Sequence, residues 1–316
     1  MHLPMKRLLL PLILLTLTGL LPACAGGPRN RVQKSSPAEV RKAPVTVKVD
    51  RYQYQTVQEY NHDSGAYTQG LFFYDGKLYE SAGQYGESSL RIVDLETGKV
   101  LKRKNFPRKY FLEGACVLEG RLYVLTWKEN VCFVCDPATL EQQATLRYQG
   151  EGWGLTTDGQ SLIMSDGSAV IRYRNPQTFA VERELTVRYN GQELAWLNEL
   201  EYFGGRIWAN VYGLELLVSI DPETGNVVED IDCRGILPAK LKKPTTDVFN
   251  GIAFDPSDGG LYVTGKYWPK LFRIRKTKWF VSLPPKGGAV RRRGLRGRGG
   301  KSGQRRAPPC GKHRQA

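Results

Sequence analysis

The sequence predicts an all-β fold built from five similar repeats. At five positions a polar or aromatic residue precedes an apolar strand, and in four of them a Gly comes next. These positions recur about every 40 to 50 residues, a spacing typical of blade-type repeats. Few stretches between them have the period of a helix. The five positions are Gln69, Glu113, Trp153, Asn198 and Asn250.

Each repeat continues with the same order of signals. The first strand ends at a tight-turn pair such as Asp75-Gly76 or Gly204-Gly205. Two further strands follow, and four repeats add a turn and a fourth strand. Four antiparallel strands per repeat are typical of a β-propeller blade, so the sequence predicts a five-bladed β-propeller. The second strands cover 77–83, 121–127, 161–166, 206–212 and 261–266, and the third strands cover 89–94, 131–136, 170–175, 216–221 and 271–275.

The fifth repeat lacks a fourth strand. It stops after 271–275, whereas residues 45–60, which belong to no repeat, look like a strand. We expect this N-terminal strand to complete the last blade and close the ring, because closure leaves no unpaired edge. The predicted propeller therefore covers 43–275.

The first 42 residues look like a targeting segment and a linker. Lys6 and Arg7 precede an apolar run that is too short to span a bilayer, so 1–23 is predicted to be a signal peptide. The sequence LPAC, which ends at Cys24, resembles a bacterial lipobox. An ordinary secretory signal with a chance Cys is the alternative. Residues 24–42 are polar, rich in Gly, Pro and Ser, and predicted to be a flexible tether.

Lipidation of Cys24 would place the chain in the bacterial cell envelope. We expect a lipid-anchored protein on the periplasmic side of a membrane. Ala25 is not an acidic retention residue, so by resemblance to other bacterial lipoproteins the outer membrane is favoured over the inner one.

The net charge of +15 arises from the C-terminal end. Residues 273–316 hold fifteen Lys and Arg and no Asp or Glu, while the rest of the chain is balanced. We expect 276–316 to be a solvated, disordered tail, either native or the product of a frameshift. Charge of this kind is weak evidence for nucleic-acid binding, which we do not expect.

The cysteines do not predict a metal site. Cys132 and Cys135 are three residues apart in an apparent strand, so they point to opposite faces. No second CxxC pair is present, and His62 is the one His of the predicted propeller. We expect buried free thiols, with a disulfide as the alternative, and activity without a metal or cofactor.

In a propeller, each inner strand begins on the face where the second strand ends. The five repeat positions therefore share a face with the ends of the second strands. Gathering one carboxylate, one amine, several amides and aromatic rings there predicts a pocket for a small polar group. The second-strand ends carry Gln84, Trp127, Asp166, Asn210, Tyr212 and Lys266.

Eight runs in the chain resemble the plant and bacterial glutamine cyclotransferases. They are YTQGL, FLEGA, LTW, GEGWGL, LNELEY, WANVY, TDVFNGIAFDP and VTGKYWPKLF, and the resemblance covers about 54–274. It implies a five-bladed propeller. It also implies an activity, the conversion of an N-terminal Gln to pyroglutamate with release of ammonia. The implied partners are peptides or proteins that begin with Gln, and we expect a monomer.

The resemblance also implies roles for individual residues. Glu113 matches the acid–base carboxylate of the family, and Lys266, Gln69 and Asn198 match its polar site positions. Aromatic neighbours should raise the pKa of Glu113 toward the working pH. The substrate-binding wall would comprise Tyr67, Phe111, Trp127, Trp153 and Tyr212, and Tyr212 stands where relatives often have Trp.

Other interpretations remain open at this point. Glu113 can be a structural carboxylate paired with Lys266. Trp127 and Trp153 can be core residues, and Asn250 can cap a turn. At the level of the whole protein, the alternatives are a non-catalytic propeller that binds a peptide or sugar, and an envelope scaffold whose tail binds an anionic surface.

Overall fold

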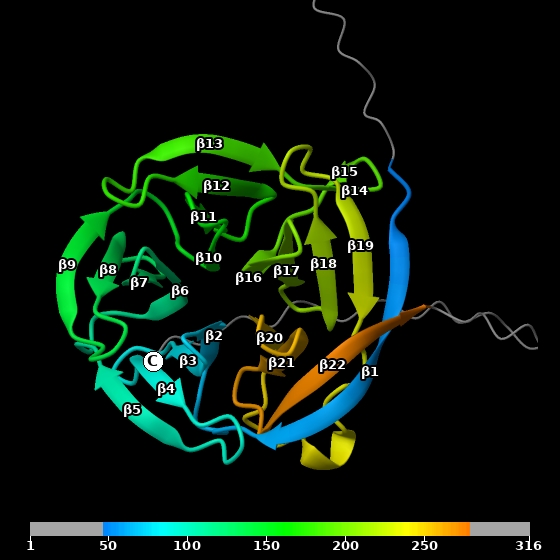
Figure 1. Cartoon of the computed structure of the whole chain (residues 1–316), viewed down its shortest axis with the longest axis horizontal. Helices are drawn as coiled ribbons and strands as arrows, with labels where there is room; N and C mark the ends of the chain where they lie inside the picture. The colour runs from blue at the N-terminus through cyan, green and yellow to red at the C-terminus, as the bar shows by residue number, and fades with distance from the viewer. Residues whose placement is uncertain (1–46, 279–316) are drawn as a thin grey trace, which may run out of the picture. The chain divides into compact units, whose positions relative to one another are not determined.

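The computed structural model describes residues 47–278 (Figure 1). The chain divides into two compact units, Met1–Pro44 and Val45–Ala316, and every described residue belongs to the second. The predicted signal peptide, the tether, the lipidation site Cys24 and the tail beyond residue 278 lie outside the described residues. No helix in the described part is long and apolar enough to cross a membrane.

Three four-stranded antiparallel sheets follow one another along the chain, each in sequence order. Their first hairpins close at pairs such as Asp75-Gly76, where φ is 49° and 67° and a tight turn is favoured. The sheets comprise β2 (Thr68–Tyr74), β3 (Lys77–Ala82), β4 (Ser89–Val93) and β5 (Val100–Asn105); β6 (Leu112–Leu118), β7 (Arg121–Thr126), β8 (Val131–Cys135) and β9 (Gln142–Arg147); and β10 (Leu155–Thr157), β11 (Leu162–Met164), β12 (Val170–Arg174) and β13 (Val181–Thr186).

The remaining long strands form one sheet with the order β16-β17-β18-β19-β1-β22-β21-β20. The N-terminal strand β1 pairs antiparallel with β22 and parallel with β19, so it joins two sets of strands. β22 runs to Lys278, so 276–278, assigned to the tail from the sequence, are strand. The strands are β1 (Asp50–Asn61), β16 (Leu197–Phe203), β17 (Arg206–Val211), β18 (Leu216–Ile220), β19 (Val227–Asp232), β20 (Phe249–Asp255), β21 (Gly260–Gly265) and β22 (Lys270–Lys278).

Two small elements interrupt this regular pattern, and the repeat pattern does not predict them. They are a hairpin of β14 (Arg188–Tyr189) and β15 (Gln192–Glu193), and the 3-10 helix η1 (Ala239–Leu241). Both lie in connections between longer strands.

The first strands of the repeats contact one another in sequence. β2 contacts β6, β6 contacts β10, β10 contacts β16, β16 contacts β20, and β20 contacts β2. In Figure 1 these strands lie toward the middle, and β5, β9, β13 and β19 lie outside them. The all-β architecture of repeated four-stranded sheets is thus consistent with a propeller.

Five apolar clusters lie between neighbouring sets of strands. One cluster packs Phe72 and Tyr79 of the first sheet against Leu122 and Phe133 of the second. The others repeat this arrangement along the chain. Apolar residues of each sheet are therefore buried against the next sheet, which fixes how the first strands meet.

The four described cysteines are free and buried, as the sequence analysis favoured. Cys135 packs in the cluster between the first two sheets, whereas Cys132 packs in the cluster between the second and third. The two thiols thus point to opposite faces of β8, as residues three apart on a strand do.

Candidate active site

Backbone irregularities position the polar residues of the candidate site. The pairing of β2 with β3 shifts between Thr68 and Gly70, where Gln69 lies. The pairing of β6 with β7 shifts between Leu112 and Ala115, around Glu113. β16 and β20 have the same irregularity around Asn198 and Asn250. Such bulges re-aim a side chain, so each polar group leaves the regular alternation of its strand.

The glycine that follows a site residue is required by close strand contact. Gly114 donates its N–H to the carbonyl of Trp153 across 2.7 Å. A Cβ on Gly114 would collide with the backbone of Leu155 and Gly154. Gly in this position therefore lets the next first strand approach, and it explains the Glu-Gly pattern physically.

The fourth repeat has Glu199 in place of this glycine, and the repeat pattern predicts no role for it. Glu199 is buried, and its carboxyl group accepts hydrogen bonds from the N–H of Leu71 at 3.2 Å and of Ile252 at 2.8 Å. Burial raises the pKa of Glu199 well above its ordinary value, and Glu201 adds to the effect. Glu199 links three first strands and is best understood as structural.

Glu113 is the buried carboxylate at the centre of the candidate site. Its side chain accepts a hydrogen bond from Nε2 of Gln69 at 3.0 Å, and the residue is 4% exposed. Burial raises the pKa of Glu113 well above its ordinary range; the positive charge of Lys266 opposes this rise, and Glu151 and Glu129 add to it. A carboxyl group with a raised pKa suits proton transfer near neutral pH.

Lys266 follows β21 and is buried among aromatic rings. Its Nζ lies 4.6 Å from the centre of the Tyr67 ring and 5.4 Å from that of Tyr212. Burial lowers the pKa of Lys266 to about 8, while the negative charges of Glu113 and Asp247 act in the opposite direction. The ammonium is held by two ring faces, an arrangement that stabilises a desolvated cation.

Three amide side chains lie close to the same bulges. Asn198, Asn210 and Asn250 are buried, and each has one polar side-chain atom without a hydrogen-bond partner among residues 47–278. The unpaired atoms of Asn198 and Asn250 are the carbonyl oxygens Oδ1, and that of Asn210 is Nδ2. Unpaired buried groups are rare in proteins, and a bound ligand is one way to satisfy them.

Asn250 does not cap a turn. It lies inside β20 and donates from Nδ2 to the carbonyl of Thr68 at 3.0 Å and to Oε1 of Gln69 at 3.5 Å. The sequence pattern was misleading here because Asn-Gly is also a turn signal. Here the Asn-Gly pair forms a bulge within the strand β20. Asn250 donates a hydrogen bond to the Gln69 amide, which in turn donates to Glu113.

Aromatic side chains form a wall around Glu113 and Lys266. Phe111 lies edge-on to Tyr67 at 5.9 Å and 5.5 Å from Trp127, measured between ring centres. Trp153 contacts Tyr212 at 5.7 Å. The structure thus brings together all five predicted wall residues, and they occupy strand starts or second-strand ends.

Trp127 and Trp153 are partly exposed, so the core alternative does not apply to them. Their indole N–H groups both donate to Oε2 of Glu151, at 2.8 Å and 3.0 Å. The carboxylate of Glu129 also bonds an aromatic residue, since it accepts a hydrogen bond from the Tyr85 hydroxyl at 2.8 Å. Both acids lie in loops outside the repeat pattern, so that pattern does not predict them.

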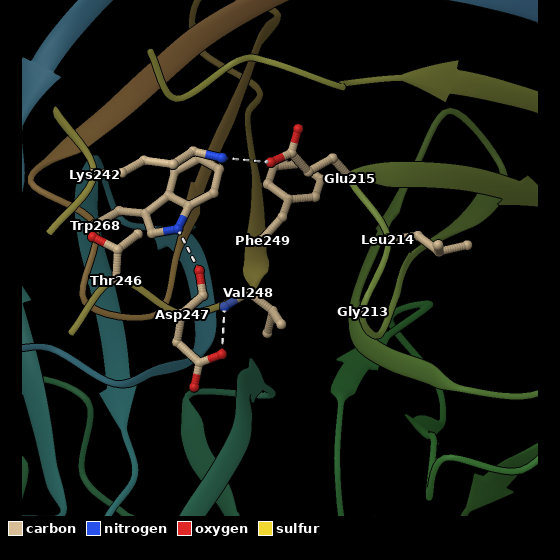
Figure 2. A pocket seen from close by; sticks show the side chains of 9 residues that line it. All are labelled: Gly213, Leu214, Glu215, Lys242, Thr246, Asp247, Val248, Phe249 and Trp268. Atoms are coloured by element: carbon tan, nitrogen blue, oxygen red, sulfur yellow. Dashed lines mark hydrogen bonds and ion pairs between the residues drawn. The ribbon is translucent and has the colours of Figure 1, made fainter. Parts of the chain in front are cut away.

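A cavity of about 320 Å³ lies near the end of β21, and none of the predicted site residues lines it (Figure 2). Its lining includes Asp247 and Val248. The N–H of Asp247 donates to the carbonyl of Lys266 at 3.0 Å, and the N–H of Lys266 donates to the carbonyl of Val248 at 2.9 Å. Trp268 donates to the Asp247 carbonyl at 2.9 Å, and Lys242 approaches Glu215 at 3.4 Å. The cavity is therefore linked to the candidate site through the backbone contacts of Lys266 with Asp247 and Val248.

No group of three or more His, Cys, Asp or Glu within residues 47–278 is arranged to hold a metal ion. His62 is committed elsewhere, since its Nε2 lies 3.0 Å from Oε1 of Glu80 and its Nδ1 lies 2.6 Å from the Trp268 carbonyl.

This geometry defines a partly dry acid–base site on an all-β scaffold. Comparison with known proteins then identifies the family: the family model for glutamine cyclotransferase matches residues 31–276, and the chain belongs to that family. Glutaminyl-peptide cyclotransferase of Arabidopsis thaliana is 40% identical over 225 residues, which is 70% of each chain. The crystal structure of Myxococcus xanthus glutaminyl cyclase matches with a TM-score of 0.69 and 34% identity, covering 74% of this chain and 100% of that one.

Proposed function

We propose that this protein is a glutaminyl-peptide cyclotransferase, which converts the N-terminal Gln of peptides and proteins to pyroglutamate and releases ammonia. The observation that carries the proposal is the buried carboxylate of Glu113 inside an aromatic wall. It accepts a hydrogen bond from Gln69 and interacts electrostatically with Lys266. Membership of the glutamine cyclotransferase family supports it independently.

We further propose that the scaffold is a five-bladed β-propeller whose ring is closed by β1. The contacts between successive first strands, which return from β20 to β2, support five blades. The pairing of β1 with β22 supports closure by an N-terminal outer strand, because it supplies the fourth strand that the last repeat lacks.

In the proposed reaction, the α-amine of Gln attacks the carbon of its own side-chain amide. A nitrogen–carbon bond forms, the bond to the amide nitrogen breaks, and that nitrogen leaves as ammonia. Glu113 takes a proton from the amine and delivers it to the leaving nitrogen, so one carboxylate serves both steps. The aromatic wall favours the folded substrate conformation and thereby supplies the near-attack geometry.

Two polar residues are proposed to stabilise charge in the transition state. The Lys266 ammonium and the Asn198 amide would donate hydrogen bonds to the oxygen that becomes negative during attack. Gln69 has a different proposed role, because its Nε2 already donates to Glu113. It would hold the carboxylate in the orientation that faces the amine.

A non-catalytic binding module is the alternative function, and an ammonia-release assay separates the two. The substrate is a Gln-Gly dipeptide, and N-acetyl-Gln-Gly is the control because it has no free amine. Enzymatic release of ammonia from the free dipeptide alone supports the proposal. Binding of the dipeptide without ammonia release, at a rate equal to the spontaneous reaction, would support the binding module.

We also propose that the mature chain is a monomer anchored to the bacterial cell envelope by a lipid on Cys24. The support is the LPAC sequence and the polar stretch after it. Mass analysis of the mature N-terminus tests the anchor: a diacylglyceryl Cys24 is expected, and an unmodified Cys24 or cleavage elsewhere would refute it.

A further inference from the structure

Exposed apolar side chains gather beside the candidate site. Among residues 47–278, six large hydrophobic side chains are exposed; two of them contact the aromatic wall, and a third is close to it in the sequence. Tyr85 lies 5.4 Å from Phe111, Trp196 lies 6.3 Å from both Trp153 and Tyr212, and Leu214 follows Tyr212 by two residues. Exposed apolar groups that cluster around a site mark a surface where a ligand or partner binds.

Trp196 is the most informative of these residues. It is 58% exposed, so burial does not explain a large indole at this position. Its φ is 68°, in the left-handed region that bulky residues rarely adopt. A glycine would occupy this conformation without strain. Trp196 is therefore a large exposed side chain at a position whose backbone favours glycine, and this combination motivates a functional hypothesis.

The backbone around Trp196 fixes the indole against the wall. Its N–H donates to the carbonyl of Gly167 at 2.7 Å, and its own carbonyl accepts from the N–H of Tyr212 at 2.7 Å. The planes of the Trp196 and Tyr212 rings are 29° apart, so the two rings are stacked. Tyr212 in turn contacts Lys266. A continuous aromatic surface thus leads from the buried ammonium to the exposed indole.

We propose that Trp196 binds the side chain of the residue that follows the N-terminal Gln of the substrate, with a preference for aromatic and large apolar side chains. This inference rests on the proposed function. The reacting Gln must lie among the buried groups, so the rest of the peptide must leave toward solvent. The wall continues outward through Tyr212 to Trp196, which places a flat apolar surface on that route.

The test compares Gln-Gly with Gln-Phe as substrates of the wild type and of Trp196→Gly. Glycine accepts the left-handed backbone, so this variant is expected to fold with unchanged or higher thermal stability. In wild type, kcat/KM should be higher for Gln-Phe. In Trp196→Gly it should fall about three- to tenfold for Gln-Phe, mainly through KM, and stay unchanged for Gln-Gly. Trp196→Tyr should restore most of the preference.

Two variants make the result specific. Leu101→Ala removes another exposed apolar side chain, on the distant strand β5, and should change neither substrate's kinetics. An equal loss for both dipeptides in Trp196→Gly would mean that the indole only supports Tyr212 and Trp153, and would overturn the proposal. Unchanged kinetics for both would also overturn it. If wild type cyclises neither dipeptide, the proposed function itself fails, which is a distinguishable result.

Discussion

Gln69 donates a hydrogen bond from Nε2 to Oε1 of Glu113 across 3.0 Å, and the two residues occupy bulges in first strands that contact each other. A donor in this position stabilises the ionised form of the carboxylate, against the burial that favours the neutral form. The bond also fixes which way the carboxylate faces. Glu113 is therefore positioned by the adjacent repeat rather than by its own strand alone.

Replacing Gln69 by Leu should raise the pKa of Glu113 further. The variant loses the donor to the carboxylate, so the acidic limb of the kcat/KM profile should move to higher pH. The measurement is a pH–rate profile with Gln-Gly. Gln142→Leu, in the exposed strand β9, is the control and should leave the profile unchanged. An acidic limb that does not move in Gln69→Leu would contradict the proposed role.

Lys266→Met should affect both limbs of the same profile. The Lys266 charge lowers the pKa of Glu113, so its loss should shift the acidic limb to higher pH. The pKa of Lys266 is about 8, and its ammonium donor is lost as the pH rises through that value. The basic limb near pH 8 should therefore disappear, and kcat should fall at all pH values.

Lys77→Met, an exposed position at the start of β3, serves as the control for loss of a surface lysine. A basic limb that persists unchanged in Lys266→Met would show that another group titrates there. Unchanged kcat would show that no charged donor at Lys266 is needed.

Gly114→Ala should damage both stability and activity. The added Cβ collides with the backbone of Leu155 and Gly154, which is not free to move away as a side-chain end is. We expect a loss of about 1–3 kcal/mol in the free energy of unfolding and a clear fall in kcat, because Glu113 is the preceding residue. Denaturant unfolding and steady-state kinetics measure the two effects.

The matched control is Gly120→Ala. Gly120 has a φ of 72° and nothing within 4 Å of an added Cβ, so the variant carries backbone strain without a collision. It should lose some stability and keep its kcat. If Gly114→Ala keeps its kcat as well, strand contact at Gly114 does not position Glu113.

Dialysis against a chelator should leave turnover of Gln-Gly unchanged. The proposed reaction needs a proton carrier and donors to an oxyanion, which Glu113, Lys266 and Asn198 supply. Activity before and after exhaustive dialysis is the measurement, with an ammonia standard to exclude interference with detection. A loss of turnover that added zinc restores would contradict this account.

Much of the site was predictable because it repeats. Gln69, Glu113 and Asn198 each stand at the same place in a repeat, and the close approach of first strands explains the glycine that follows Gln69 and Glu113. The second-strand ends followed from hairpin geometry, which places Trp127, Tyr212 and Lys266 beside them. The repeat pattern therefore predicts where the site residues lie, and the family resemblance implies their proposed roles.

The residues that sequence reasoning missed act through partners that no local pattern reveals. Glu199 bonds the backbone of Leu71 and Ile252, which are far away in the sequence. Glu151 joins two indoles from a loop. The conformation of Trp196 is set by Gly167 and Tyr212, so its positive φ could not be read from its own neighbours.

The most direct test of Glu113 as the proton carrier is the kinetics of Glu113→Gln. This change keeps size and polarity but removes the group that transfers the proton, so the rate with Gln-Gly should fall about 10²–10⁴-fold while the fold and substrate binding persist. The acidic limb of the pH profile should vanish. The basic limb should move to lower pH, because the charge of Glu113 raises the pKa of Lys266. Near-wild-type turnover by a correctly folded Glu113→Gln variant would contradict the central claim.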